Sequence, residues 1–185
     1  MRILFSLALA AAIPCTAAAQ VTINPKVGIS ISDMKDATAD VDTRSRLGYQ
    51  GGVDLRLGGM VFLQPGLHLQ QTGLEQQLPG NVSYNLDVRG LHIPVLLGLK
   101  LGTGMAGVRL VGGPALTMVQ SVKDNVGLVT KEDLTTNRLG GMAGIGVDLM
   151  GLSVDLTGEM GFTRFFEQGS DAKLRTIRLS AGLRF

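Results

Sequence analysis

The chain has few of the residues that define several protein classes. It contains one cysteine and no tryptophan among 185 residues, and only 4% of its residues are aromatic and 17% charged. A single cysteine excludes a disulfide framework. The net charge is +2 and basic and acidic residues are interspersed, so the sequence lacks the clustered basic residues of a nucleic-acid-binding protein. An apolar content of 45% excludes a disordered chain.

Long apolar runs are also absent, with an exception at the N-terminus. Residues 1–19 begin with a positive charge, continue through an apolar stretch from Ile3 to Ile13 and end in three alanines. This is the pattern of a secretory signal peptide, and the stretch is shorter than the roughly 18–20 residues of a membrane-spanning helix. We expect cleavage between Ala19 and Gln20, which leaves residues 20–185 as one mature domain.

Glycine and strict alternation are what the chain has in abundance. Glycine accounts for 26 of the 185 residues, about twice its usual share. From residue 21 onwards, apolar and polar residues alternate with a period of two, which is typical of strands with one apolar and one polar face. Eight such runs lie at about residues 21–32, 47–58, 61–70, 84–101, 106–118, 138–149, 152–162 and 176–185.

Some residues interrupt the alternation. The parity of the fourth run changes near Arg89 and Gly90, which indicates a β-bulge and a change of face there. Pro65, Pro94 and Pro114 lie inside runs. Because proline cannot donate a ladder hydrogen bond, we interpret these prolines as further local bulges.

The connections between the runs alternate in length. Short connections lie at residues 58–59, 102–104 and 150–151, and long polar ones near residues 33–46, 73–83, 120–137 and 167–174. Tight periplasmic turns and long outer loops alternate in this way in outer-membrane barrels. Both chain ends would then lie on the periplasmic side.

Eight amphipathic strands can close with the apolar face inward, as in a soluble lipocalin-like barrel, or outward to lipid. Charges such as Asp54, Arg109 and Asp148 on the polar faces, with many glycines, suit a narrow eight-stranded lumen. Strands of about 10–12 residues suit a tilted crossing of the bilayer. We therefore predict an all-β fold: an eight-stranded antiparallel up-and-down transmembrane β-barrel with a polar lumen.

Aromatic residues and the C-terminus support the membrane alternative. The few aromatic residues lie near strand ends, as in an interfacial girdle: Tyr49, Tyr84 and Phe162 at the long-loop rim, Phe62 and Phe185 at the short-turn rim. The last strand ends with Leu179, Ala181, Leu183 and Phe185 in alternation. This ending resembles the signal that the barrel assembly machinery reads, so we expect that machinery and outer-membrane lipid as partners.

Several segments resemble the PorT-like outer-membrane β-barrel family of Bacteroidota, a group of small OmpA/OmpX-like barrels. GLHIPVLLGLK at 90–100 is similar to the family's Leu-x-Ile-Pro-Leu-Leu-Leu strand, with His92 at a usually acidic position and Gly98 at a usual lysine. VGGPALTM at 111–118 and MAGIGVDL at 142–149 are similar to its Gly-Pro strand and its glycine-rich sixth strand. The resemblance spans about residues 24–185 and implies the barrel fold and an outer-membrane location.

Catalytic motifs are not found in the mature chain. It has no cysteine, no Gly-x-Ser-x-Gly elbow and no phosphate-binding loop. His68 and His92 lack the His-x-Ser pattern of lipid A-modifying barrels. A turn near Pro79 and Gly80 would place the two histidines opposite each other in the lumen, where a metal would need a third ligand. We expect a hydrogen-bonded pair, and neither enzyme activity, nor cofactor, nor metal.

An ion pair between Glu159 and Arg178 is predicted inside the barrel. If Thr163 faces Leu174 in the last hairpin, Glu159 lies opposite Arg178 and both point inward. A carboxylate in a largely desolvated lumen needs a partner, and the fork of arginine suits it. Alternative partners of Glu159 are Lys26 and Arg109.

The sequence thus predicts a small outer-membrane protein with a structural or surface-interaction role. Eight strands leave an interior that side chains fill, so we expect a plugged lumen and partner specificity in the long loops. We expect a monomer that has an extracellular or envelope protein partner and does not bind nucleic acid. A lipid-modifying outer-membrane enzyme and a secreted lipocalin-like binder remain alternatives.

Overall fold

The computed structural model describes residues 20–35, 43–45, 47–78, 82–102, 105–124, 137–163 and 173–185. The predicted signal peptide, including Ala19, lies outside these residues. No helix in the described ranges is long and apolar enough to cross a membrane. The strands are β1 (Val21–Lys35), β2 (Thr43–Ser45), β3 (Leu47–Gly58), β4 (Val61–Leu78), β5 (Val82–Gly102), β6 (Ala106–Asp124), β7 (Asn137–Leu149), β8 (Leu152–Gly161) and β9 (Lys173–Leu183).

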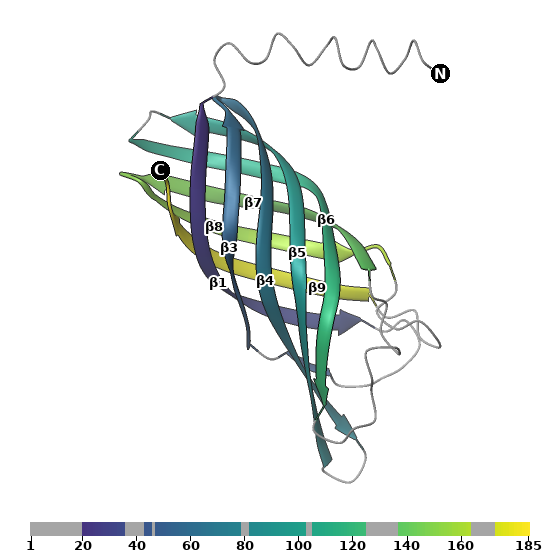
Figure 1. Ribbon diagram of the computed structural model, residues 1–185. Coiled ribbons are helices and arrows are strands. Elements are labelled where there is room, and N and C mark those ends of the chain that lie inside the picture. Colours follow the sequence, from purple (N-terminus) through teal and green to yellow (C-terminus); the bar gives the residue numbers. More distant parts are fainter. Residues whose placement is uncertain are drawn as a thin grey trace, which may run out of the picture.

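The strands form one closed antiparallel barrel (Figure 1). Each long strand pairs with the next one, and β9 pairs with β1 to complete the circle. The short strand β2 pairs with β4 next to β3, so the wall consists of the eight predicted long strands. Ile23 and Phe185 exchange two backbone hydrogen bonds of 3.0 and 2.9 Å, which extends the closing pair to the last residue.

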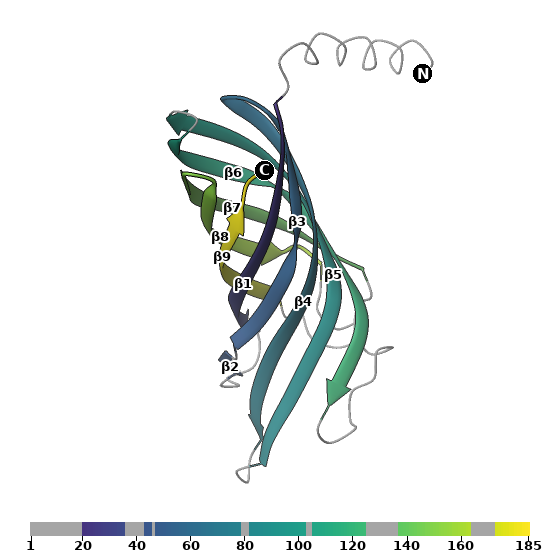
Figure 2. The same ribbon diagram turned by 60° about the vertical axis from the view of Figure 1, so that its left-hand side comes forward.

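The register of the pairs fixes the tilt of the barrel. The directly paired residues can be followed from strand to strand around the wall. A path that starts at Val21 of β1 returns to β1 at Ile31, ten residues further along the strand. Such a shift over eight strands corresponds to a tilt of about 40°, and the strands run obliquely in Figure 2. The path passes through Leu57, Leu63, Leu97, Gly112, Ala143, Gly158 and Ile177.

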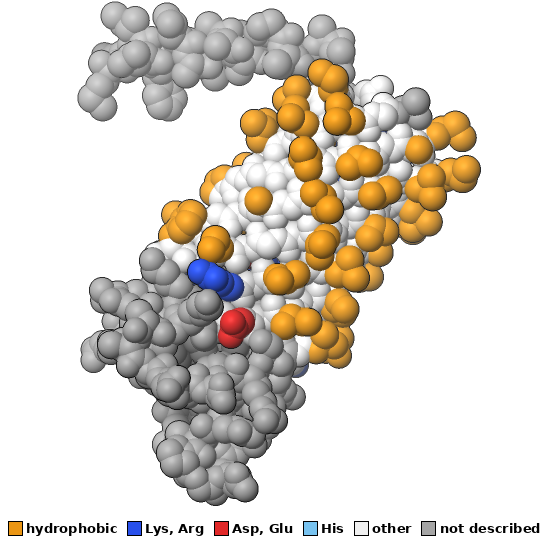
Figure 3. All heavy atoms as spheres, turned by 180° about the vertical axis from the view of Figure 1, so that it is seen from behind, with side chains coloured by type: hydrophobic (Ala, Val, Ile, Leu, Met, Phe, Trp, Pro, Cys, Tyr) orange, Lys and Arg blue, Asp and Glu red, His pale blue; other side chains and the backbone are white. Residues whose placement is uncertain are grey.

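Apolar side chains cover the outside of the barrel. On β8, Leu156 is 47% exposed, whereas its neighbours Asp155 and Thr157 are 3% and 6% exposed. In Figure 3 apolar side chains spread over the wall in view, and the charged ones lie near the grey segments. The prediction of outward apolar faces is therefore confirmed. The lipocalin-like alternative is wrong, because it needs the apolar face inside.

The irregularity predicted at Arg89 and Gly90 is confirmed, but its effect on the strand is not. The register between β5 and β6 shifts between these two residues, and Gln120 of β6 is the additional residue. Because the additional residue belongs to β6, β5 keeps its parity, with Val88 and His92 both buried. The predicted change of face in this strand is wrong.

Pro65, Pro94 and Pro114 do not form bulges, so that interpretation is also wrong. The register of the strand pairs is the same on both sides of each proline. A proline removes one backbone donor without adding a residue. The ladder therefore lacks one hydrogen bond at each proline, but the register does not shift, because a bulge needs an additional residue.

Several strands extend further than predicted at the end opposite the termini, most of all β4 and β6. β4 and β5 stay paired from Gly73 opposite Asp87 to Leu78 opposite Val82, and β6 follows β5 up to Asp124. The predicted long loop at 73–83 is therefore mostly a hairpin, which projects beyond the rest of the wall (Figures 1 and 2). Its β4 arm, residues 73–78, lacks a clear alternation, which is why the sequence predicted a loop there.

Candidate functional site in the barrel interior

A charged cluster centred on Asp148 fills the barrel near the short turns. The carboxylate of Asp148, which is 0% exposed, accepts hydrogen bonds from Arg109 Nε at 2.9 Å and Arg56 Nη1 at 3.0 Å. Arg184 Nη1 and Lys100 Nζ lie 3.1 and 3.8 Å from it. Burial of a carboxylate without such partners would lower the stability of the fold by on the order of several kcal/mol, because its charge would be desolvated and uncompensated. The cluster joins β3, β5, β6, β7 and the C-terminus.

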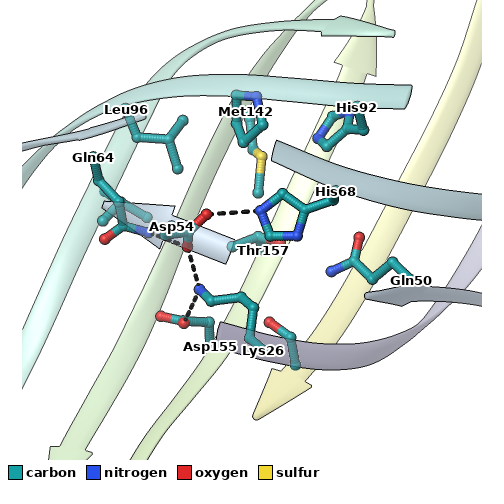
Figure 4. Close-up of a pocket in the computed structure, with 13 residues that line it drawn as sticks. Lys26, Gln50, Asp54, Gln64, His68, His92, Leu96, Met142, Asp155 and Thr157 are labelled. Carbon is teal, nitrogen blue, oxygen red and sulfur yellow. Dashed lines mark hydrogen bonds and ion pairs between the residues drawn. The ribbon is translucent and has the colours of Figure 1, made fainter. Parts of the chain in front are cut away.

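A second cluster lies next to it around Asp54 (Figure 4). Lys26 Nζ bridges two carboxylates, 2.6 Å from Asp54 Oδ2 and 2.7 Å from Asp155 Oδ2. The other oxygen of Asp54 lies 2.7 Å from His68 Nε2. Arg109 Nη2 lies 2.9 Å from Asp155 Oδ1 and so connects this cluster to the one around Asp148.

Apolar side chains also occupy the lumen, so the predicted polar interior is only part of what fills it. Phe62, Leu96 and Val111 are buried together inside the barrel, with Met142 packed against them. The guanidinium of Arg56 lies 5.2 Å from the centre of the Phe62 ring. Phe62 therefore does not belong to an outer aromatic girdle, and that prediction is wrong. Parity could have revealed this, because Phe62 alternates with the outward residues of its strand.

A third cluster occupies the loop end of the lumen and contains the predicted pair. Arg178 Nη1 donates a hydrogen bond of 2.5 Å to Glu159 Oε2, and Arg178 Nη2 donates one of 3.2 Å to Gln70 Oε1. His92 Nε2 lies 3.7 Å from the same Glu159 oxygen. The structure thus brings Glu159 and Arg178 together.

The register predicted for the last hairpin is nevertheless wrong. Thr157 faces Arg178, and Glu159 faces Thr176, which is two residues away from the expected pairing. A shift of two residues keeps every side chain on its face. Both charges therefore still point inward, and the long arginine side chain spans the diagonal. The expected pairing of Thr163 with Leu174 fails for the same reason.

His68 and His92 face each other across β4 and β5, as predicted. Their ring centres are 6.3 Å apart. Each ring has a hydrogen-bond partner other than the expected second histidine, Asp54 for His68 and Thr117 Oγ1 at 2.9 Å for His92. In the described part of the chain, no group of three or more His, Cys, Asp or Glu is placed to hold a metal.

Small cavities lie between the described residues of the interior. One is bordered by Lys26, Asp54 and His68, another by Glu159 and Arg178, and each has a volume of ≈ 20 Å³. A water molecule needs about 10–15 Å³ of such volume, so each cavity has room for about one. Side chains, not solvent, fill the described interior.

The C-terminal residues proposed as an assembly signal all point outward. Leu179, Leu183 and Phe185 are 47%, 52% and 76% exposed, and Ala181 lies on the same face. Gln20, the expected first mature residue, is exposed at the short-turn end.

The sequence matches the family described as outer membrane protein beta-barrel domain over residues 5–185. The chain belongs to this family. Its location is therefore the outer membrane, and its apolar outer wall faces lipid.

Solved outer-membrane proteins have a similar fold. OprG from Pseudomonas aeruginosa matches with a TM-score of 0.58 and 12% identity, covering 91% of this chain and 97% of its own. Ail of Yersinia pestis, in complex with the heparin analogue sucrose octasulfate, gives 0.54 and 13% over 90% and 99%. Neisserial surface protein A gives 0.52 and 8% over 88% and 97%. Such low identities show the fold alone. No curated protein sequence matches this chain.

Proposed function

We propose that this protein is a plugged outer-membrane barrel that acts at the cell surface through its loop end and does not conduct solutes. The observation that carries the proposal is the filled interior. Among the described residues, ion pairs and the Phe62 cluster occupy the lumen, and the cavities beside Asp54 and Glu159 measure only ≈ 20 Å³ each. A passing solute would have to break several desolvated ion pairs at once.

The charges at the loop end indicate the class of partner. Residues 36–46, 79–81, 125–136 and 164–172 together contain seven Asp and Glu but only four Lys and Arg. Electrostatic complementarity favours partners of opposite charge. We therefore favour a neutral or cationic extracellular or envelope protein over a polyanion such as the heparin analogue bound to Ail.

Conductance tests the plugged lumen. The purified protein inserted into planar lipid bilayers should give no stable conductance steps. A Phe62→Ala, Leu96→Ala variant, which removes the apolar part of the plug, should give more leak than the wild type. Stable conductance of the wild type would refute the proposal.

Shortened loops test the surface role. Residues 125–136 and 164–172 can each be replaced by a short turn in the chromosomal copy. We expect this strain to behave like a deletion strain although the shortened barrel is still present in the outer membrane. Full complementation by the shortened protein would assign the function to another part of the molecule.

The lipid-modifying alternative finds no support in the placement of the histidines. Both histidines of the chain lie inside the barrel, His68 4% and His92 1% exposed, whereas a lipid substrate would lie against the outer wall. We further infer a relationship to PorT-like barrels from the segment at 90–100. A phylogeny of full-length sequences tests this inference, and grouping with other barrel families would contradict it.

A further inference from the structure

A groove in the outer wall lies over β6 to β9. Its volume is ≈ 780 Å³, its floor includes Pro114, Gly141, Ala143 and Gly158, and Phe162 lies at its loop end. Leu156, directly below Gly158 on the same face of β8, is a large apolar residue, as is usual on a lipid-facing wall. The groove is thus a gap in the apolar surface, more than twice the volume of the ≈ 340 Å³ groove over β3 to β6.

Barrel packing does not require a small residue at Gly158. A Cβ atom added there would meet only the Ala143 carbonyl oxygen, at 4.0 Å. At Gly144, on the lumen side, a Cβ atom would lie 2.6 Å from Thr157 Cγ2, so packing does require glycine there. Glycine weakens a strand because it loses more conformational freedom than other residues. Contacts with the described residues of the barrel therefore do not account for the glycine at position 158.

Arg175 marks the boundary of the apolar surface above the groove. The outward residues of β9 run from Leu183 to Ile177 and then reach Arg175. With the tilt of the strands, Leu183 and Arg175 are about 20 Å apart along the barrel axis, near the roughly 25 Å height of the apolar band. Longer loops mark the extracellular side of such barrels. Arg175 therefore lies at the surface of the outer leaflet.

The exposed guanidinium of Arg175 is available to an anion. Among the ion pairs formed within the described residues, none involves Arg175. Asp33 lies opposite it on β1 and is also exposed. Arg89, the exposed arginine on β5, already donates a hydrogen bond of 3.2 Å to Gln71.

We propose that the groove binds an acyl chain of a phosphorylated glycolipid of the lipid A class, and that Arg175 binds its phosphate. The apolar groove lies in the outer-leaflet half of the wall, directly below the arginine. In such a lipid the acyl chains likewise lie below the phosphorylated headgroup. Guanidinium and phosphate form strong, charge-assisted and often bidentate hydrogen bonds. Asp33 competes with the phosphate for the arginine.

Native mass spectrometry of the full-length folded protein, incubated with purified lipid A, tests the proposal. We expect the wild type to retain one lipid A molecule and to bind dephosphorylated lipid A and phosphatidylglycerol more weakly. Arg175→Gln should lower the affinity roughly five-fold, as expected for one interfacial charge. Gly158→Leu and Ala143→Leu, which fill the groove, should lower it at least as much, and Asp33→Asn should raise it.

Two control variants lie in the smaller groove of ≈ 340 Å³ over β3 to β6, whose arginine already donates a hydrogen bond to Gln71. Arg89→Gln removes the other exposed arginine, and Gly51→Leu fills an outward glycine position on β3, where a Cβ atom would meet only Val27 Cγ1 at 3.9 Å. Both controls should bind lipid A like the wild type. Each variant is first shown to fold by its gel mobility without boiling. Equal losses in controls and groove variants, no retention by the wild type, or equal retention of phosphatidylglycerol would each overturn the proposal.

Discussion

Glu159 and Arg178 show how the buried charges of the lumen depend on one another. The Glu159 carboxylate has Arg178 at 2.5 Å and His92 at 3.7 Å, and Arg178 also contacts Gln70. The side chains of Glu159 and Arg178 are only 13% and 4% exposed, so each charge relies mainly on the other and little on hydration. Removal of one partner leaves the other charge desolvated. The interaction should therefore be measurable as a coupling between the two residues.

A double-mutant cycle measures this coupling. Glu159→Gln and Arg178→Gln should each lower the free energy of unfolding of the detergent-folded protein by roughly 3–5 kcal/mol. The double variant should lose clearly less than the total of the two single losses, because neither of these two charges is left behind without the other. Denaturant titrations of the four proteins give the result. Additive losses would show that the two residues do not interact.

Gly98 and Phe62 are coupled by shape instead of charge. A Cβ atom at Gly98 would overlap the Phe62 ring. Gly98→Ala should therefore lower the free energy of unfolding by about 1–3 kcal/mol. Phe62→Leu in the same chain should restore part of the loss. Gly158→Ala, where space is free, is the matched control and should leave stability unchanged or raise it. Equal effects of the two glycine changes would contradict the packing described for Phe62.

At the scale of the strands, alternation predicts faces more reliably than registers. The outward faces of β8 and β9 follow from the sequence because a lipid-facing strand must present apolar residues at every second position. The register of this hairpin does not follow, because a shift of two residues preserves both faces. The sequence therefore predicts that Glu159 and Arg178 both point into the lumen and lie near each other, but not that their contact is diagonal. The position of the bulge at Gln120 was not predictable, because the sequence alone does not show which of two paired strands carries the additional residue.

An arginine on the outer face tests the orientation of β8. Leu156 lies midway along the outward face, so Leu156→Arg should cost roughly 2–4 kcal/mol, and Ile145→Arg on β7 the same. Phe162→Arg at the loop rim is the matched control, with an expected cost of about 0–1 kcal/mol. Unfolding in lipid vesicles measures the three values. A cost that does not depend on depth would mean that this wall does not face lipid.

Deletion of Phe185 separates assembly from stability in β9. Its side chain is 76% exposed and packs little against the barrel, but its backbone pairs with Ile23. We propose that Phe185 acts with Leu179, Ala181 and Leu183 as the assembly signal. The truncated protein should accumulate in the periplasm or be degraded, while Phe185→Tyr, which keeps an aromatic end, should assemble normally. Normal surface levels of the truncated protein would show that the signal is not needed.

At the scale of the whole molecule, closure and the lumen network act together. The wall closes through β1 and β9, with a shift of ten residues around the circle. Inside, Lys26 joins β1 to β3 and β8, and Asp148 joins β7 to β3 and β6. No strand can leave the closed part of the wall without breaking two ladders and the contacts that its side chains make in the lumen. Unfolding should therefore be slow and cooperative.

Gel mobility tests this closure. A closed ladder has no free edge at which unfolding can begin, and its backbone groups are satisfied within the wall. The unboiled protein in detergent should therefore migrate differently from the boiled protein. Ile23→Pro removes the donor of one closing hydrogen bond to Phe185, so the folded band should disappear at a lower temperature in this variant. Leu63→Ile, on an outward position away from the closing strands, is the control and should behave like the wild type. Identical mobility before and after boiling, in a protein that also stays soluble without detergent, would contradict a closed membrane barrel.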